Sequence, residues 1–239
     1  MDSKPKPQNS KIMFRVLLIV ACLIVFINSL PNEFVIDDFL IIQQNPTIGN
    51  LSYLPKIFVT SYAVSPPTTY YRPLFSATLQ VEYQIWKLRP CGYRLINILL
   101  HILVTLTIFQ MGLRLLPNTF HAFLTGLIYA IHPVHVESVA WISGRADILA
   151  CLGLLLGFYW YLKYRSDENH SILLLLSSLL LYFLGLLGKE MAVTLPLLII
   201  FYDFTFPPSE KENYPFAKRC TAYAGYFLVL FNYLLIRKY

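Results

Sequence analysis

Residues 95–116 read LINILLHILVTLTIFQMGLRLL, an apolar run with one charged side chain, Arg114. The hydrocarbon core of a bilayer requires about 20 such residues for one helical crossing. The run therefore predicts a membrane-spanning helix. Six further segments have the same character, although two are short for a full crossing. The seven predicted spans are 13–31, 95–116, 119–134, 146–163, 171–188, 191–206 and 219–236.

The composition of the whole chain agrees with a lipid environment. Of its 239 residues, 56% are hydrophobic and 13% are charged, about half the charged share of roughly 25% in soluble domains. The net charge of +6 does not indicate a nucleic-acid-binding protein, because the basic residues form no dense stripe. The four cysteines include no CxxC pair, so neither a disulfide framework nor a thiolate metal site is predicted.

The N-terminal segment sets the predicted orientation. Four basic residues precede the main apolar stretch of the first span: Lys4, Lys6, Lys11 and Arg15. Such charges favour the cytoplasmic side, and the sequence 28–31 lacks a convincing signal-peptidase site. We therefore expect a cytoplasmic tail over residues 1–12 and an uncleaved first span. Alternation then places the connections 32–94, 131–147 and 188–194 together on the opposite, outer face.

The predicted outer loop, 32–94, is longer than a plain connector. Its segment 74–88 has aromatic and leucine side chains near helical spacing, namely Phe75, Leu79, Tyr83 and Trp86. One interpretation is a helix lying in the membrane interface with its rings at headgroup depth. The other is an ordinary helix packed on the spans. No repeat array or low-complexity segment divides the chain, so one module over residues 1–239 is predicted.

Ionisable residues from three separate connections fall on this outer face. They are Asp37, Asp38, Arg72, His132, His135, Glu137, Arg145, Asp147, Lys189 and Glu190. A charge at the bilayer centre costs about 2.5–3.5 kcal/mol on insertion scales, so such residues normally pair or line a polar cavity. The pattern predicts a water-accessible pocket at the outer membrane surface, lined by carboxylates, imidazoles and cations.

The same residues have simpler structural interpretations. The Asp37–Asp38 pair could be an exposed pair in the loop, or it could cap the segment that follows it. Arg145 could pair with Asp147, and Lys189 could form an interfacial salt bridge with Glu190.

The segment 132–137, HPVHVE, has three interpretations of its own. Two imidazoles and a carboxylate would suit a metal ion, but Pro133 breaks the regular helix that would present both imidazoles on one face. Pocket lining or acceptor contact, and structural hydrogen bonding, are the two interpretations favoured over a metal site.

Five segments carry a resemblance to a known family. They are FVIDDFLIIQQNP (34–46), YYRPL (70–74), GYRLINILLHILV (92–104), IHPVHVESVAWISGRADILA (131–150) and LLGKEMAVTLPLLIIFYDF (186–204). Together they resemble the membrane half of the TMTC-type O-mannosyltransferases, which also carry tetratricopeptide repeats and belong to the GT-C superfamily of membrane glycosyltransferases. The resemblance extends from about residue 28 to 204, and its most specific block is 132–147.

The resemblance implies a glycosyltransferase that moves a sugar, mannose in this family, from a polyprenyl-phosphate donor to a hydroxyl of a protein or glycan. Asp37 or Asp38 matches the acidic residue of the first outer loop that acts as general base, a role typically worth ~10²–10⁴-fold. Repulsion between these neighbours would raise the pKa of one of them.

The leaving phosphate would need cations, and the implied donor-phosphate ligands are Arg72, Arg145 and Lys189. The residues implied to line the pocket or to contact the acceptor are His132, His135, Glu137, Asp147 and Glu190. Neither a nucleotide nor another cofactor is expected, and no metal.

The family continues with further spans and repeats, whereas this sequence ends at Tyr239. Three explanations fit this end of the sequence: it is a fragment, it works with a partner, or it has lost activity. Two rival functions remain beside the transferase. A lipid-linked sugar transporter or flippase would place polar residues within the spans and at both faces, and mid-span charges are scarce here. A non-catalytic module would bind lipid or a partner. The outer face would be periplasmic in a bacterium and lumenal in the endoplasmic reticulum of a eukaryote.

Overall fold

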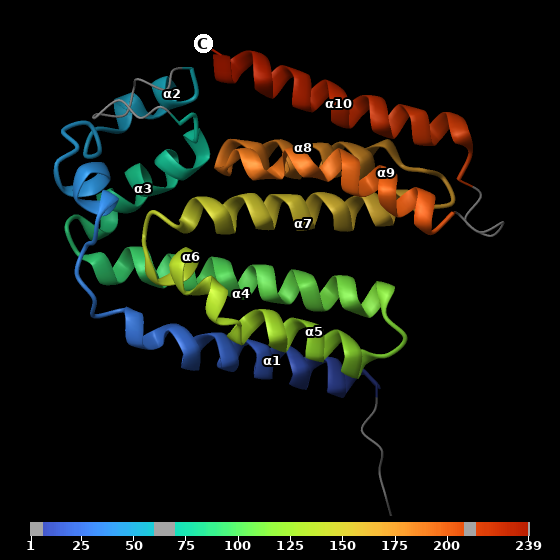
Figure 1. Ribbon diagram of the computed structural model, residues 1–239, viewed down its shortest axis with the longest axis horizontal. Helices are drawn as coiled ribbons and strands as arrows, with labels where there is room; N and C mark the ends of the chain where they lie inside the picture. The colour runs from blue at the N-terminus through green and yellow to red at the C-terminus, as the bar shows by residue number, and fades with distance from the viewer. Residues whose placement is uncertain (1–6, 60–69, 208–213, 239) are drawn as a thin grey trace, which may run out of the picture.

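The computed structural model describes residues 7–59, 70–207 and 214–238, and these form helices joined by turns, with no strand among them (Figure 1). One helix lies in each of the seven predicted spans. These helices are α1 (Pro7–Phe26), α4 (Pro90–Leu115), α5 (Thr119–Ile131), α7 (Arg145–Arg165), α8 (Ile172–Gly188), α9 (Leu195–Thr205) and α10 (Phe216–Lys238).

Four stretches within the described residues are long and apolar enough to cross a bilayer: Gln8–Ser29, Pro90–Leu115, Arg145–Arg165 and Phe216–Arg237. The prediction of an all-α, polytopic membrane protein is therefore confirmed. The helices α5 and α8 are apolar but shorter, so the number of crossings stays a prediction.

Proline explains where the two short predicted spans begin and end. The helix α5 stops at Ile131 because Pro133 disfavours helical backbone at His132, which is extended with ψ 127°. In the predicted span 191–206, the residues Glu190–Thr194 form a 3₁₀ turn, η6, before α9 begins at Leu195. Pro196 then occupies the first turn of α9, where its missing N–H removes no helical hydrogen bond.

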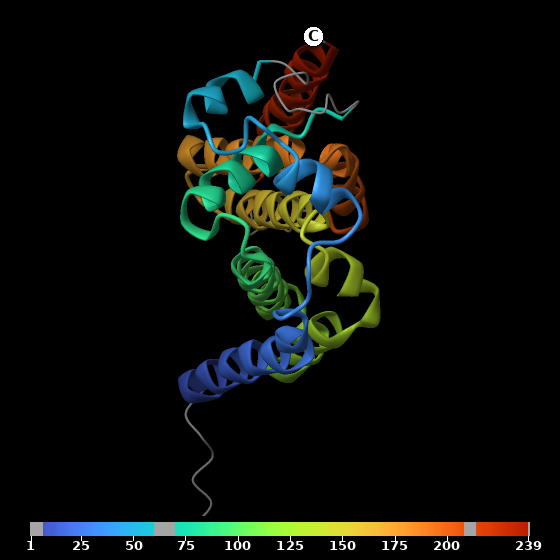
Figure 2. The same cartoon turned by 90° about the vertical axis from the view of Figure 1, so that its left-hand side faces the viewer.

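The connections predicted to share one face lie together at one end of the bundle, which we name the loop end. Figure 1 shows this end on the left, where α1 finishes, and Figure 2 views it face on. Its short elements are η1 (Ile27–Ser29), η2 (Phe39–Gln43), η3 (Leu51–Tyr53), α2 (Leu54–Ile57), α3 (Pro73–Trp86), η5 (Pro133–His135), α6 (Val136–Ala140) and η6. The helix α1 begins at the opposite end. The assignment of the loop end to the outer membrane face stays a prediction.

The helix α3 occupies the segment for which an interfacial helix is predicted. Its side chains Phe75 and Leu79 are buried in a cluster with Tyr93 at the start of α4, so α3 packs on the bundle as in the second interpretation. It also exposes apolar side chains, with Ile85 67% exposed. Its depth in a membrane interface stays a prediction.

A buried ion pair fastens three helices at the end opposite the loop end. Arg165, at the end of α7, donates to Asp203 of α9 at 2.9 Å, and both side chains are almost fully buried. Asp203 also accepts hydrogen bonds from Tyr161 of α7 and, at 2.7 Å, from Tyr223 of α10. The carboxylate therefore connects α7, α9 and α10.

Asp203→Asn is expected to lower the free energy of unfolding by about 3 kcal/mol, because breaking one partner of a buried pair leaves an uncompensated charge. The asparagine keeps the shape of the side chain and some of its hydrogen bonds. The loss of stability therefore measures the effect of removing the negative charge. The measurement is thermal unfolding in detergent, with Glu168→Gln as the control, because Glu168 is an exposed carboxylate near the same end. Equal melting temperatures for the two variants would contradict this role.

Candidate active site

The two neighbouring carboxylates of the first loop have different surroundings. Asp38 is fully buried. Its Oδ1 accepts hydrogen bonds from the backbone N–H of Ser143 at 3.1 Å and from the Ser143 hydroxyl at 2.6 Å, and its Oδ2 accepts one from the N–H of Val35 at 3.3 Å. Asp37 is exposed. Ile36 just before the pair has φ 48°, a left-handed conformation that is strained for a β-branched residue.

Burial raises the pKa of the Asp38 carboxyl, and its hydrogen bonds from Ser143 and Val35 only partly oppose this. A raised pKa for one member of the pair is predicted from the sequence. The cause differs, because desolvation and not repulsion by Asp37 is the main effect. The structure thus leaves Asp37 as the solvent-exposed carboxylate of the pair.

Arg145, the first residue of α7, is fully buried and joins three elements. Its guanidinium donates to Oδ1 of Asn97 at 2.6 Å, to the carbonyl of Tyr93 at 2.8 Å, to the hydroxyl of Thr78 at 3.3 Å and to the carboxylate of Glu82. The interpretation that Arg145 pairs with Asp147 is wrong, because its partner is Glu82 of α3. With no exposed atom, Arg145 holds α3, α4 and α7 together at the loop end.

The other two predicted cations form ion pairs that the sequence does not indicate. Lys189 donates to Asp147 at 2.6 Å, and Arg72 donates to Glu190 at 3.2 Å. The alternative pairing of Lys189 with Glu190 is wrong. Burial opposes the ionised form of Glu190, but hydrogen bonds from Arg72 and from the Glu190 backbone, together with the charges of Arg72 and Arg237, outweigh this and lower its pKa. All four side chains remain 22–37% exposed, so each pair contributes at most about 1 kcal/mol and can exchange partners.

The segment 132–137 lies next to an aromatic stack. His135 lies over Tyr129, with 4.1 Å between ring centroids, and is 5.3 Å from His101. Burial, and secondarily the nearby His132, lower the pKa of His135, so it is neutral at pH 7. The Nδ1 of His132 accepts a hydrogen bond from the N–H of Val134 at 3.2 Å. Glu137 is exposed. Among the described residues, no three His, Cys, Asp or Glu side chains are grouped to hold a metal ion.

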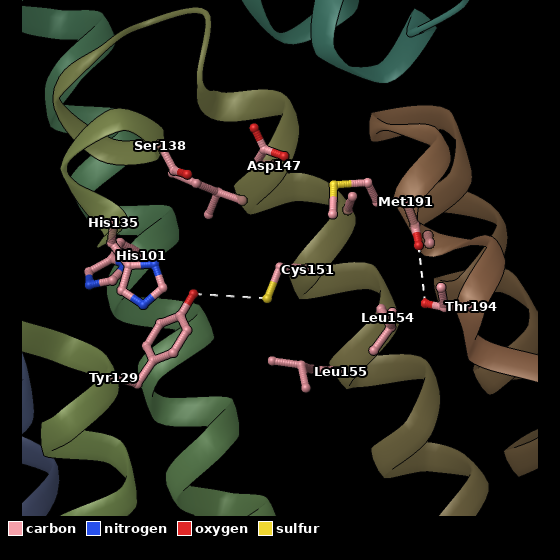
Figure 3. A pocket seen from close by; sticks show the side chains of 13 residues that line it. His101, Tyr129, His135, Ser138, Asp147, Cys151, Leu154, Leu155, Met191 and Thr194 are labelled. Carbon is pink, nitrogen blue, oxygen red and sulfur yellow. Dashed lines mark hydrogen bonds between the residues drawn. The ribbon is translucent and has the colours of Figure 1, made fainter. Parts of the chain in front are cut away.

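A cavity of about 350 Å³ opens between α4, α5, α7 and η6. Figure 3 shows Asp147 and Ser138 at one end of it, and Leu154 and Leu155 farther along α7. Two predicted site residues, His135 and Asp147, line it, and Lys189 joins it through Asp147. The others predicted lie at the same end of the bundle but do not line it: Asp37, Asp38, Arg72, His132, Glu137, Arg145 and Glu190.

The cavity also has lining residues that sequence reasoning missed, chiefly His101, Tyr129 and Cys151. The hydroxyl of Tyr129 is 3.9 Å from the Sγ of Cys151 (Figure 3). A sequence signal existed for Cys151. It follows Asp147 by four residues, which places both on one face of α7. For Tyr129 and His101, only the packing of α5 on α4 shows that they meet there.

The fold and this arrangement define a helical membrane protein with a cavity lined at its polar end by one carboxylate, Asp147, and two imidazoles, with Lys189 paired to that carboxylate. Over 82% of its length the chain is 34% identical to protein O-mannosyl-transferase TMTC1 of Mus musculus. It is 30% identical over 89% of its length to protein O-mannosyl-transferase F38B6.6 of Caenorhabditis elegans. To human protein O-mannosyl-transferase TMTC2 it is 32% identical over 76%.

These relatives confirm the resemblance to the TMTC-type O-mannosyltransferases. The chain spans only 22%, 31% and 23% of the length of the three relatives, respectively. No protein-family model and no solved structure matches the chain.

Proposed function

We propose that the chain is the donor-binding and catalytic part of a membrane glycosyltransferase that moves mannose from a polyprenyl-phosphate donor to a hydroxyl group of a protein. The observation that carries the proposal is the cavity. Its lining changes from Asp147 and His135 at the loop end to leucines of α7 farther in. A polar sugar phosphate attached to a long apolar chain has the same division of character. The names of the relatives support the sugar and the acceptor class.

The two ion pairs formed by the neighbours Lys189 and Glu190, of which the first includes Asp147 of the cavity lining, fit a phosphate that enters and leaves. Lys189 and Arg72 are held by carboxylates in partly exposed pairs, so a phosphate can replace a carboxylate without removing a buried charge from its only partner. Arg72 offers a planar, two-pronged donor for phosphate oxygens. Arg145 is different, because its partner is buried with it. In this proposal it fixes the framework and does not contact the phosphate.

The exposed carboxylate of Asp37 supplies the base. It takes the proton from the acceptor hydroxyl while that oxygen forms a bond to the anomeric carbon of the sugar. The bond between the anomeric carbon and the phosphate oxygen breaks, and its electrons leave with the polyprenyl phosphate. Lys189 and Arg72 stabilise the negative charge that develops on this leaving group. The proton on Asp37 then passes to water.

The proposal places the loop end, with Asp37, on the non-cytoplasmic face, which is the lumen of the endoplasmic reticulum in a eukaryote and the periplasm in a bacterium. The start of α1 lies at the other end (Figure 1) and is cytoplasmic. The spans and the exposed apolar edge of α3 contact membrane lipid.

A farnesyl phosphate is expected to slow the reaction of Cys151 with a maleimide, because Cys151 lines the cavity beneath Asp147. The sample is a single-cysteine variant, Cys22→Ala, Cys91→Ser and Cys220→Ser, purified in detergent. The labelling rate is followed by intact-protein mass spectrometry. Farnesol and inorganic phosphate, each alone, should protect Cys151 less, because farnesol lacks the phosphate group and inorganic phosphate lacks the apolar chain.

The matched control is the variant that keeps only Cys220, an exposed residue of α10. Its labelling should not respond to farnesyl phosphate. Equal protection of Cys151 by farnesol and farnesyl phosphate would leave an apolar cavity with no phosphate recognition, and no protection by either would remove the cavity as the donor site.

A further inference from the structure

Arg94 holds two distant segments of the loop end by their main chains. It lies near the start of α4, as the fifth residue of the helix, and is 1% exposed. Its Nε donates to the carbonyl of Ala140 at 2.9 Å, and its two terminal nitrogens donate to the carbonyls of Asn32 and Glu33. Buried carbonyls require such donors. The planar guanidinium can satisfy all three acceptors at once, which a lysine ammonium cannot do with the same geometry.

This use of a buried arginine differs from the others in the protein. Arg145 and Arg165 are also buried, and each is paired with a carboxylate, Glu82 and Asp203 respectively. Among the described residues, no carboxylate lies within salt-bridge distance of Arg94. The hydrogen bonds of the side chain therefore go to loop backbone, and its charge acts on Asp38 and Glu33 at longer range than an ion pair.

The same two segments are joined a second time by Asp38. Its carboxylate accepts from the N–H and hydroxyl of Ser143 and from the N–H of Val35. Arg94 thus binds carbonyls, and Asp38 binds N–H groups, of the segments 32–38 and 140–143. The exposed Asp37 lies in the first of these segments. The second leads within four residues to Asp147 at the cavity mouth.

We propose that Arg94 is a positioning residue that clamps the segment 32–38 to the segment 140–143 and so fixes Asp37 relative to the mouth of the cavity. The catalytic consequence rests on the proposed function, whereas the clamp itself does not. Releasing one of two reacting groups by about 1 Å can cost ~10²-fold in rate. Loss of Arg94 should therefore act on turnover more than on donor binding.

Arg94→Met in the full chain tests both parts. Hydrogen–deuterium exchange, read by mass spectrometry, should become faster in 32–38 and in 140–143 together, while α7 and α8 keep their protection. In a membrane assay with mannosyl-phosphoryl polyprenol, kcat should fall ~10²-fold with KM for the donor changed less than about threefold, the sign of a lost transition-state interaction. Arg94→Lys should restore part of kcat.

The matched control is Arg114→Met. Arg114 lies on the same helix and also donates to a main-chain carbonyl, that of Leu162 at 2.9 Å, but at the opposite end. It should change neither the exchange of the two segments nor kcat. A second variant, Ser143→Ala, removes the hydrogen bond from the Ser143 hydroxyl to Asp38 and changes no charge. It should loosen the same two segments to a smaller extent, which keeps the clamp testable should Arg94→Met fail to fold.

Unchanged exchange in either segment, in Arg94→Met or in Ser143→Ala, overturns the clamp. A rise in KM with kcat unchanged overturns the positioning role of Arg94. Such a result would mean that the variant lost binding shared equally by the ground state and the transition state. A third outcome is faster exchange of both segments in Arg94→Met together with no sugar transfer by the wild type. That outcome supports the clamp and counts against the proposed function alone.

Discussion

Asp37→Asn is expected to lower mannose transfer ~10²–10⁴-fold, the usual worth of a general base. The amide has nearly the shape of the carboxylate but cannot take the proton of the acceptor hydroxyl. Because Asp37 is exposed, the change should leave the fold and the cavity intact. The measurement is transfer from mannosyl-phosphoryl polyprenol in membranes, together with protection of Cys151 by farnesyl phosphate. Transfer should be lost while protection is retained.

Asp38→Asn separates the base from its neighbour. Asp38 is buried and bonded to Ser143 and Val35, so its loss should loosen the loop and lower transfer less than the loss of Asp37. Glu33→Gln is the charge-matched control, because Glu33 is an exposed carboxylate of the same loop, and it should transfer at the wild-type rate. Wild-type turnover in both Asp37→Asn and Asp38→Asn would end the assignment of the base to this loop.

The helical framework follows from local sequence, and the sequence predicts it well. The apolar runs place both ends of α7 within two residues, the end of α5 within three and the start of α4 within five. The sequence predicts the start of α9 at residue 191, whereas the helix begins at Leu195. Hydropathy does not distinguish a 3₁₀ turn from an α-helix when Met191, Ala192 and Val193 have apolar side chains in both.

The grouping of the polar residues at one end also follows from sequence, because alternation of spans brings their connections together. Their partners do not follow. Nothing in the sequence indicates that Glu82 is the partner of Arg145. The face that α3 turns toward α4 and α7 depends on tertiary packing, so this pair cannot be predicted from local sequence. The division between Asp37 and Asp38 likewise depends on the backbone turn at Ile36, which residue types alone do not indicate.

Gly153→Ala is expected to destabilise the protein by about 3 kcal/mol or more, the upper range for adding a methyl group to a packed interior. The helices α7 and α8 meet at Gly153 and Gly185. A Cβ on Gly153 would lie 2.4 Å from the Cα and 2.6 Å from the backbone nitrogen of Gly185. Backbone atoms cannot rotate away as a side chain can, so the two helices must separate. Thermal unfolding in detergent should show a lower melting temperature.

Gly225→Ala is the matched control for this contact, since both changes replace a helical glycine and gain about 1 kcal/mol in helix propensity. A Cβ on Gly225 would lie 3.0 Å from Cδ1 of Leu179, the flexible end of a side chain that can change rotamer. Gly225→Ala should therefore be neutral or stabilising, whereas Gly153→Ala lowers the free energy of unfolding.

Because α7 carries Asp147 and α8 leads into Lys189, separation of these helices should also pull apart the ion pair between these two residues. Farnesyl phosphate should then protect Cys151 less in Gly153→Ala than in Gly225→Ala. Equal stability and equal protection in the two variants would show that α7 and α8 do not make this contact.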